Sequence, residues 1–251
     1  MADSELLQLS RVKSMRALGA VLFALFLHGA AIGQQSEQFR IGFEAAAQIT
    51  QVLAKAGVSA SLQYNGKCSP PVLVPDLPPI RHLKAYPQSP ADSFRSMFSV
   101  RPQMAVSQER NGTIRVVENG IQTDVLSISI RHLSFTGITD PDEALGQVLD
   151  AAEVQSFMQT RGIGQPRFMW SDVRWYELPG LKTSRAAGVP SSDELNDVTV
   201  ADALDHILKL FPGFWLYQNC VSSDGQRIVY FGLFPVPGRM WGWEEGNTFV
   251  K

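Results

Sequence analysis

Hydrophobic residues recur at three- and four-residue spacing in four segments of the chain. This spacing gathers apolar side chains on one face of a helix, where they can pack on a core. The predicted helices cover residues 43–56, 89–98, 142–160 and 200–211. Ser89-Pro90 and Asp140-Pro141 have the sequence of an N-cap followed by proline in the first turn, which favours a helix start at both.

Between these segments, short apolar or alternating runs indicate strands. The predicted strands cover residues 58–64, 80–84, 104–109, 113–118, 125–133, 214–220 and 226–234. Two turn sequences, Arg110-Asn111-Gly112 and Ser223-Asp224-Gly225, join four of the strands into two hairpins. Asn111-Gly112-Thr113 also matches a glycosylation sequon, although turn geometry alone explains Asn-Gly at this place. Helices and antiparallel hairpins together predict an α+β fold.

One combination of elements occurs twice along the chain. A shift of 110 residues aligns Ala91-Asp92 with Ala201-Asp202 and Gln108 with Gln218, and each copy reads as a helix followed by a hairpin. This indicates an internal repeat, with chance agreement as the alternative. We therefore expect two related units packed together. Their predicted bounds are 34–135 and 136–235, the second with an irregular segment at 163–198, and a C-terminal tail follows at 236–251.

The start of the chain has the pattern of an export signal. Arg11, Lys13 and Arg16 precede an apolar run at 17–27, and small residues follow at 29–33. This order predicts a signal peptide over residues 1–33 and a periplasmic or secreted protein. The alternative is an uncleaved anchor, because the apolar segment 17–32 falls just short of the roughly 17 to 25 residues that span a bilayer. After cleavage no membrane span is expected.

The charge of the chain bears on its partners, and its cysteines bear on a disulfide. The chain has 22 Lys and Arg against 24 Asp and Glu, a formal net charge of −2, and no basic block. Nucleic acid is therefore not an expected partner. The two cysteines, Cys68 and Cys220, both lie in the part predicted to be exported, which favours one disulfide over two unpaired thiols. Neither cysteine has the spacing of a redox motif or a zinc site.

The sequence offers no constellation that predicts catalysis. It has no Gly-x-Ser-x-Gly elbow, no phosphate loop and no His-Glu-x-x-His, so no catalytic, cofactor-binding or metal-ligating residue is predicted. Asp202 and His206 stand four residues apart on a predicted helix. Two ligands without a third rarely bind a metal tightly, and we interpret them as a solvated surface pair.

Aromatic residues gather in the last third of the chain, with all five tryptophans among them. In the second hairpin Phe214 and Trp215 point to opposite faces of a strand, so at least one set of rings should be buried. The Trp and Tyr residues outside this hairpin are typical of sites that bind a partner or a sugar. The residues predicted to contact a partner are Trp170, Trp175, Tyr176, Trp241 and Trp243.

Three segments together resemble a known domain. They are residues 49–58, with Ala56-Gly57-Val58 at the end, residues 91–98, and residues 113–118. In their order and spacing they resemble the short domain at the N-termini of secretins and TonB-dependent receptors, over residues 39–118 and more faintly over 199–234. The resemblance implies a small α/β module in a bacterial periplasm that contacts other envelope proteins and has no enzymatic chemistry of its own.

The leading hypothesis from the sequence is a non-catalytic exported protein that binds an envelope protein or peptide partner. One alternative is a glycan-binding module that uses the C-terminal aromatic residues. The other is a hydrolase whose catalytic residues are dispersed along the chain and gathered by folding.

Overall fold

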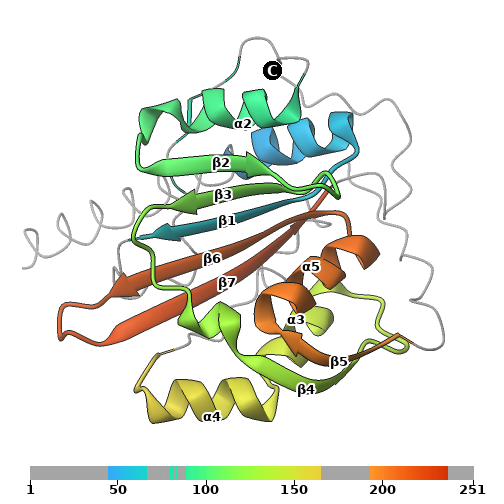
Figure 1. Ribbon diagram of the computed structural model, residues 1–251, viewed down its shortest axis with the longest axis vertical. Helices are drawn as coiled ribbons and strands as arrows, with labels where there is room; N and C mark the ends of the chain where they lie inside the picture. Colours follow the sequence, from blue (N-terminus) through green and yellow to red (C-terminus); the bar gives the residue numbers. More distant parts are fainter. Residues whose placement is uncertain are drawn as a thin grey trace, which may run out of the picture. The chain divides into compact units, whose positions relative to one another are not determined.

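The computed structural model describes residues 45–66, 78, 80, 81, 83, 89–164 and 193–236. The fold is of the α+β class, with helices and strands interspersed along the chain (Figure 1). After a helix at residues 45–56, the elements are β1 (Ala60–Asn65), α2 (Pro90–Met97), η1 (Phe98–Val100), β2 (Met104–Gln108), β3 (Ile114–Glu118), η2 (Asp124–Ser127), β4 (Ser129–Ser134), α3 (Pro141–Leu149), α4 (Ala152–Thr160), β5 (Glu194–Thr199), α5 (Val200–Leu210), β6 (Gly213–Val221) and β7 (Arg227–Pro235).

Five strands form one sheet in the order β2-β3-β1-β6-β7. The pairs β2–β3 and β6–β7 are antiparallel hairpins, whereas β1 is parallel to both β3 and β6. The register places Leu62 of β1 between Val116 and Leu216. A separate two-stranded antiparallel sheet joins β4 to β5. Both predicted hairpins are therefore confirmed, and β1 connects them.

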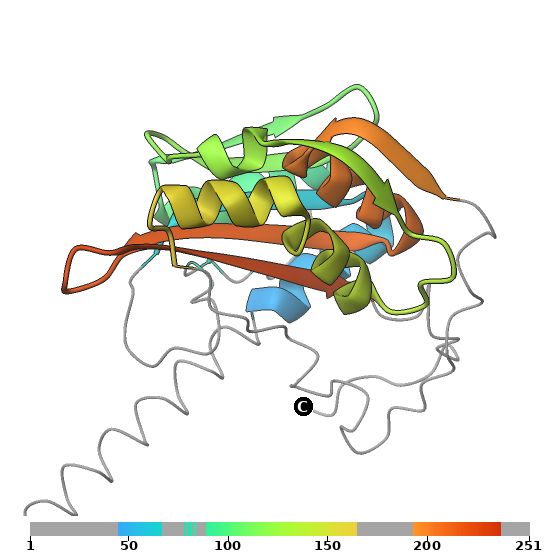
Figure 2. The ribbon, with the colours of Figure 1, turned by 90° about the horizontal axis from the view of Figure 1, so that it is seen from below.

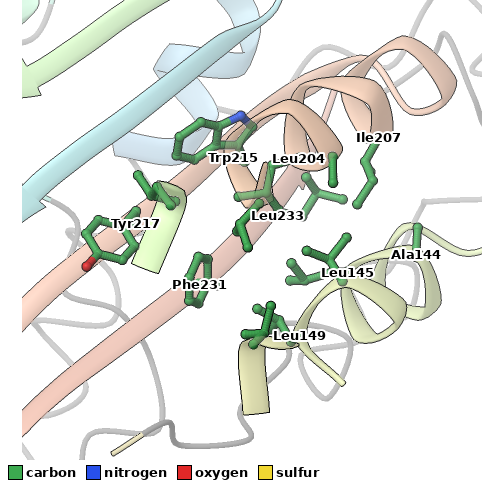
Figure 3. Close-up of a cluster of buried hydrophobic side chains, with 14 of the residues drawn as sticks. Ala144, Leu145, Leu149, Leu204, Ile207, Trp215, Tyr217, Phe231 and Leu233 are labelled. Atoms are coloured by element: carbon green, nitrogen blue, oxygen red, sulfur yellow. The ribbon is translucent and has the colours of Figure 1, made fainter. Parts of the chain in front are cut away.

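Side chains alternate between the two faces of the five-stranded sheet. We call the side of Trp215 and Tyr217 the α5 face, because α5 packs on it, and the side of Phe214 and Leu216 the α2 face. The α5 face carries a hydrophobic cluster in which side chains of β6 and β7 meet those of α3 and α5 (Figure 3). Its labelled members are Ala144, Leu145, Leu149, Leu204, Ile207, Trp215, Tyr217, Phe231 and Leu233.

Two helices cover the α2 face. Figure 2 shows the helix at residues 45–56 on the side of the sheet opposite α3 and α5. The helix α2 packs against β2 and β3 and buries Phe94 and Met97. On β2, Met104 is buried while Ala105 on the other face is exposed, so α2 covers the side of Met104. Because β6 is covered on both faces, eight of its nine residues are buried.

The helix starts follow the capping chemistry expected from the sequence. Ser89 and Asp140 are N-caps, and their side-chain oxygens accept hydrogen bonds from Asp92 N at 3.4 Å and Asp142 N at 2.8 Å. The helix at residues 45–56 ends at Gly57, whose φ of 69° suits glycine. Both predicted helix starts are confirmed, as is the predicted end of the first helix at residue 56.

The predicted long helix at 142–160 is wrong, because the chain forms α3 and α4 with an extended residue, Ala151, between them. The reason lies in the hydrophobic pattern. Leu149 and Val154 are both buried. In one continuous helix they would point about 140° apart, because five residues turn a helix that far beyond a full turn, and both could not face the same core. A break after α3 allows the stripe of α4, with Val154 and Met158, to face the same core.

Three strand predictions also need correction. Residues 125–127 of the predicted strand 125–133 form η2, where Val125 and Leu126 are buried, and the strand β4 begins only at Ser129. The irregular segment predicted at 163–198 contains most of β5, whose polar residues have no apolar alternation to reveal it. Ile80, Arg81 and Leu83 are not in a strand, and Arg81 N donates to Met97 O at the end of α2.

The two helix–hairpin segments differ in how they join the sheet. In the first, β1 pairs with the second strand of the hairpin, β3; in the second, β1 pairs with the first strand, β6. Both segments contribute to one sheet, and their origin by repetition stays a prediction. Within the residues that the structure describes, no helix is long and apolar enough to cross a membrane.

Candidate functional site

A cluster of charged side chains on the α5 face joins β3 to α5. The guanidinium of Arg115 donates from Nη1 to Asp205 Oδ1 at 3.1 Å and from Nη2 to Asp205 Oδ2. Arg115 also donates from Nε to Glu109 Oε1 at 2.7 Å and from Nη1 to Ser61 Oγ at 3.0 Å. The Arg115 and Asp205 side chains are only 18% and 20% exposed, so this ion pair is partly withdrawn from water.

Trp215 completes the cluster from β6. Its Nε1 donates to Asp205 Oδ1 at 2.7 Å, and the Arg115 guanidinium carbon lies 5.8 Å from the centroid of the indole ring. Burial acts to lower the pKa of Arg115, but the carboxylates of Asp205 and Glu109 outweigh it and hold that pKa above its ordinary value. Because four Arg115 hydrogen bonds are made within the protein, the cluster braces the fold and leaves little of the guanidinium for a ligand.

A second cluster lies nearer the turn of the β6–β7 hairpin. Arg227 donates from Nη1 and Nη2 to the two oxygens of Asp124 at 3.0 and 2.6 Å, and from Nε to Asn219 Oδ1 at 2.6 Å. Tyr217 OH donates to Gln122 O at 2.9 Å and accepts from Arg227 Nη2 at 3.1 Å. These bonds attach the segment after β3 to the hairpin.

Two groups of this cluster have pKa values shifted in opposite directions, for different reasons. The hydrogen bond from Arg227 is the main reason that the pKa of Asp124 is lowered, because it favours the ionised carboxyl. Burial raises the pKa of Tyr217 to about 12, even though Arg227 acts against it. A phenol held neutral in this way is a hydrogen-bond donor at neutral pH and not a catalytic base.

The predicted solvated pair of Asp202 and His206 is wrong. Asp202 turns back to the helix start, where Oδ2 accepts from Thr199 N at 3.2 Å and from Thr199 Oγ1 at 2.6 Å in a capping box. His206 Nε2 instead lies 2.9 and 3.0 Å from the two oxygens of Asp193, and its ring stacks on Phe135 with centroids 5.7 Å apart. The imidazole is therefore largely covered and joins α5 to the chain before β5.

The aromatic residues of the second hairpin are core residues, and both sets of rings are buried where the sequence predicted at least one. Phe214, Trp215 and Tyr217 are completely buried, and Phe231 is 5% exposed. The partner-contact residues predicted from the sequence, Trp170, Trp175, Tyr176, Trp241 and Trp243, lie outside the described residues. The aromatic side chains of this hairpin are therefore not available to stack on a sugar.

Of the two cysteines in the predicted disulfide, the structure describes Cys220. Cys220 is 3% exposed on β6, and there is no free thiol in the described part of the chain. Cys68 lies outside the described residues, so the pairing of Cys68 with Cys220 stays a prediction. The structure does bring their neighbours together, since Gly66 N donates to Asn219 O at 2.9 Å.

The outer edges of the sheet differ in their main-chain hydrogen bonding. On β7, Gly164 forms a bridge in which Gly164 N donates to Arg227 O at 2.8 Å and Val229 N donates to Gly164 O at 2.9 Å. On β2, by contrast, no residue in the described ranges pairs with the outer edge. The side chains of Ala105 and Ser107 on this strand are exposed.

The register shows which main-chain groups of β2 point outward. Glu109 N donates to Thr113 O and Asn119 N donates to Gln103 O, both at 2.9 Å, so the odd-numbered residues bond to β3. Because main-chain direction alternates along a strand, the N–H and C=O of Val106 and Gln108 point away from the sheet. We call these four groups, with the outward C=O of Met104, the β2 edge.

The described residues contain no group of three or more His, Cys, Asp or Glu that could hold a metal ion. His206 and Asp193 are hydrogen-bonded to each other, but no Ser or Cys hydroxyl or thiol within the described ranges is hydrogen-bonded to the imidazole. Comparison with protein-family models, curated proteins and solved structures finds no match to this chain. The resemblance to the short domain of secretins and TonB-dependent receptors therefore stays a prediction.

Sequence reasoning did not find the Arg115 cluster or the β2 edge. Arg115 and Asp205 are 90 residues apart in the chain, and nothing local to either indicates the other. The hairpin containing β2 was predicted, but its position at the edge depends on the order of strands in the sheet. The signal that was available is the composition of β2, Met-Ala-Val-Ser-Gln, in which no residue is charged.

Proposed function

We propose that this chain is a non-catalytic exported protein that binds an envelope protein or peptide partner. The observation that carries the proposal is the β2 edge, with which no described residue pairs and which belongs to an uncharged strand at the border of an otherwise well-packed sheet. Proteins usually protect such edges with lysine, proline, a bulge or a covering segment. The described residues give the β2 edge none of these features, and such an edge is suited to pairing with another chain.

The charged clusters support the same proposal, because their members bond to other groups of the protein. Arg115 bonds to Asp205 and Arg227 bonds to Asp124, each pair joining two elements, and His206 is bonded to Asp193. Groups engaged in this way position the secondary structure and are poorly suited to proton transfer with a substrate. The burial of the aromatic rings on β6 and β7 likewise gives no support to the glycan-binding alternative.

Export is part of the proposal and rests on the charge and hydrophobic pattern of residues 1–33. A disulfide between Cys68 and Cys220 would be consistent with an oxidising compartment. The contact of Gly66 with Asn219 supports that pairing, because two residues span at most about 7 Å and Cys220 directly follows Asn219.

Site-specific photo-crosslinking in living cells tests the proposal. A photoreactive amino acid at Ser107, an exposed residue of β2, is expected to give a discrete adduct with an envelope protein. Ser156 is a matched control, because it is also an exposed serine but lies on α4, far from β2 (Figure 1). Adducts of equal yield at both positions, or turnover of ester, peptide or glycoside substrates by the purified protein, would contradict the proposal.

A further inference from the structure

We infer that the partner presents an extended segment that joins the β2 edge as a sixth strand and is recognised through its main chain. This inference rests on the proposed function and adds the chemistry of the bound segment. It starts from the five outward groups of the β2 edge: the N–H and C=O of Val106 and Gln108 and the C=O of Met104. No described residue bonds to these groups.

The spacing of these groups fits an extended peptide. Val106 and Gln108 are two residues apart on one strand, so their outward groups are separated by about 7 Å, the repeat of a β-strand. An antiparallel segment offers complementary N–H and C=O groups at the same repeat. One residue opposite Val106 and one opposite Gln108 would each exchange two hydrogen bonds, and the residue opposite Met104, two positions beyond the one opposite Val106, would donate to Met104 O.

A second copy of this chain fits the β2 edge less completely. Two β2 strands related by a two-fold axis at Val106 would exchange two bonds there and would bond Gln108 N–H to the opposite Met104 C=O. Met104 N, however, already donates to Arg101 O at 2.9 Å. Each Gln108 C=O would then lack its partner. An axis at Ser107 would exchange four bonds between Val106 and Gln108 but would place Met104 C=O opposite Arg110, which lies in the hairpin turn. A separate peptide can supply partners for both carbonyls. The hydrogen-bond inventory therefore favours a segment of another protein.

The side chains of β2 indicate weak side-chain selectivity. Ala105 and Ser107 are small and exposed on the α5 face, and the strand carries no charge that would require a complementary charge on the segment. Val106, on the α2 face, is partly buried and can contact an apolar neighbour. The expected occupant is an uncharged extended segment rich in β-branched residues, which readily adopt strand conformation.

The inference is tested by NMR titration of the ¹⁵N-labelled protein, purified from the envelope after expression of the full chain. The probe is the synthetic peptide acetyl-Thr-Val-Thr-Val-Thr-amide, for which a dissociation constant of about millimolar is expected for so short a strand. The amide signals of Val106 and Gln108 should shift and become protected from exchange. The same peptide with every amide nitrogen methylated should cause no such change, because neither of its edges can donate hydrogen bonds to β2.

Two variants separate main-chain from side-chain recognition. Val106→Pro removes an N–H that points away from β3, so the sheet keeps its bonds and the thermal midpoint should stay unchanged. Binding of the probe should fall at least about tenfold, because a hydrogen bond is lost and the ring hinders the approach of a strand. Val106→Thr is the matched control and should bind normally, since it keeps the main-chain group and a β-branched side chain.

The outcomes distinguish this inference from the proposed function. Shifts confined to residues outside β2, or equal binding by the methylated peptide, would overturn strand addition. Concentration-dependent shifts of Val106 without any peptide would assign the β2 edge to a second copy and also overturn it. If Ser107 captured a partner in cells while Val106→Pro left the capture unchanged, the proposed function would stand and recognition through the β2 edge would be wrong.

Discussion

The strands β2 and β6 occupy matching places in the two helix–hairpin segments, and a shift of 110 residues aligns Met-Ala-Val-Ser-Gln with Phe-Trp-Leu-Tyr-Gln. On the α2 face the aligned residues are alike in character: Val106 matches Leu216 and Gln108 matches Gln218. On the α5 face they differ, since small Ala105 matches Trp215. The same pattern therefore gives one strand covered on both faces and one covered on a single face.

The difference shows what decides where a layer of helices can pack. Trp215 and Tyr217 extend from β6 into the cluster below α5, whereas Ala105 and Ser107 present almost no apolar surface to cover. Burial of a large ring stabilises a packed layer by roughly 1.5 to 3 kcal/mol, and a small polar side chain offers no such gain. The Arg115–Asp205 pair marks the boundary where the covered part of this face ends.

The largest effect should come from removing the ring that distinguishes β6. Trp215→Ala is expected to lower the free energy of unfolding by about 3 to 5 kcal/mol, because it empties a buried site and removes a donor to Asp205. At the matching position, Ala105→Ser should change stability by no more than about 0.5 kcal/mol. Urea titration followed by circular dichroism measures both. Similar losses in the two variants would show that the halves of the α5 face do not differ as described.

The disulfide predicted at the end of β6 has no counterpart on β2. Mass spectrometry of unreduced protein should recover the peptides of Cys68 and Cys220 as one linked species. Reduction should lower the free energy of unfolding by about 2 to 5 kcal/mol, because the bond closes a loop of about 150 residues. The double variant Cys68→Ser/Cys220→Ser should be insensitive to reductant. Alkylation of both thiols in unreduced protein would rule the bond out.

A smaller effect should appear at high pH. Tyr217 has a pKa of about 12 in the folded protein against an ordinary value of 10.0. The unfolded chain therefore ionises first, so the contribution of Tyr217 is complete below pH 10 and is lost as the pH rises from 10 toward 12. Between pH 9 and pH 11 the wild-type protein should lose about 1 kcal/mol more than Tyr217→Phe, measured by denaturant unfolding.

The matching position of β2 supplies the control for this pH dependence. Ser107→Tyr places a phenol on an exposed strand, where it keeps an ordinary environment and should add no slope between pH 9 and pH 11. Equal slopes for wild type and Tyr217→Phe would mean that burial of the Tyr217 phenol does not govern stability in this range.

Local signals in the sequence were sufficient to predict the elements that depend on neighbouring residues. Proline and capping residues located the starts of α2 and α3, and turn sequences located both hairpins. They failed for β5, which pairs with β4 although its polar sequence has no alternation. They also failed at Ala151, where the direction of the hydrophobic stripe changes between α3 and α4.

The order of strands and the candidate site could not be predicted, because both depend on contacts distant in sequence. Nothing near Val106 indicates that its strand lies at an edge, and nothing near Asp205 indicates that Arg115 will face it. The covering of His206 by Phe135 depends on packing between separate elements in the same way. Composition could at most show that β2 lacks the charges usual on a protected edge.

The central place of β1 has a consequence for how the chain reaches its native state. Each hairpin can form from residues that are close in sequence. The strand β1, by contrast, must pair with β3, whose Ile114 lies about 50 positions later, and with β6, whose Phe214 lies about 150 positions later. Of the five strands, β1 is synthesised first, and its neighbour β6 follows about 150 residues later. The sheet is thus completed late, and until β6 arrives one side of β1 is exposed to capture by other chains.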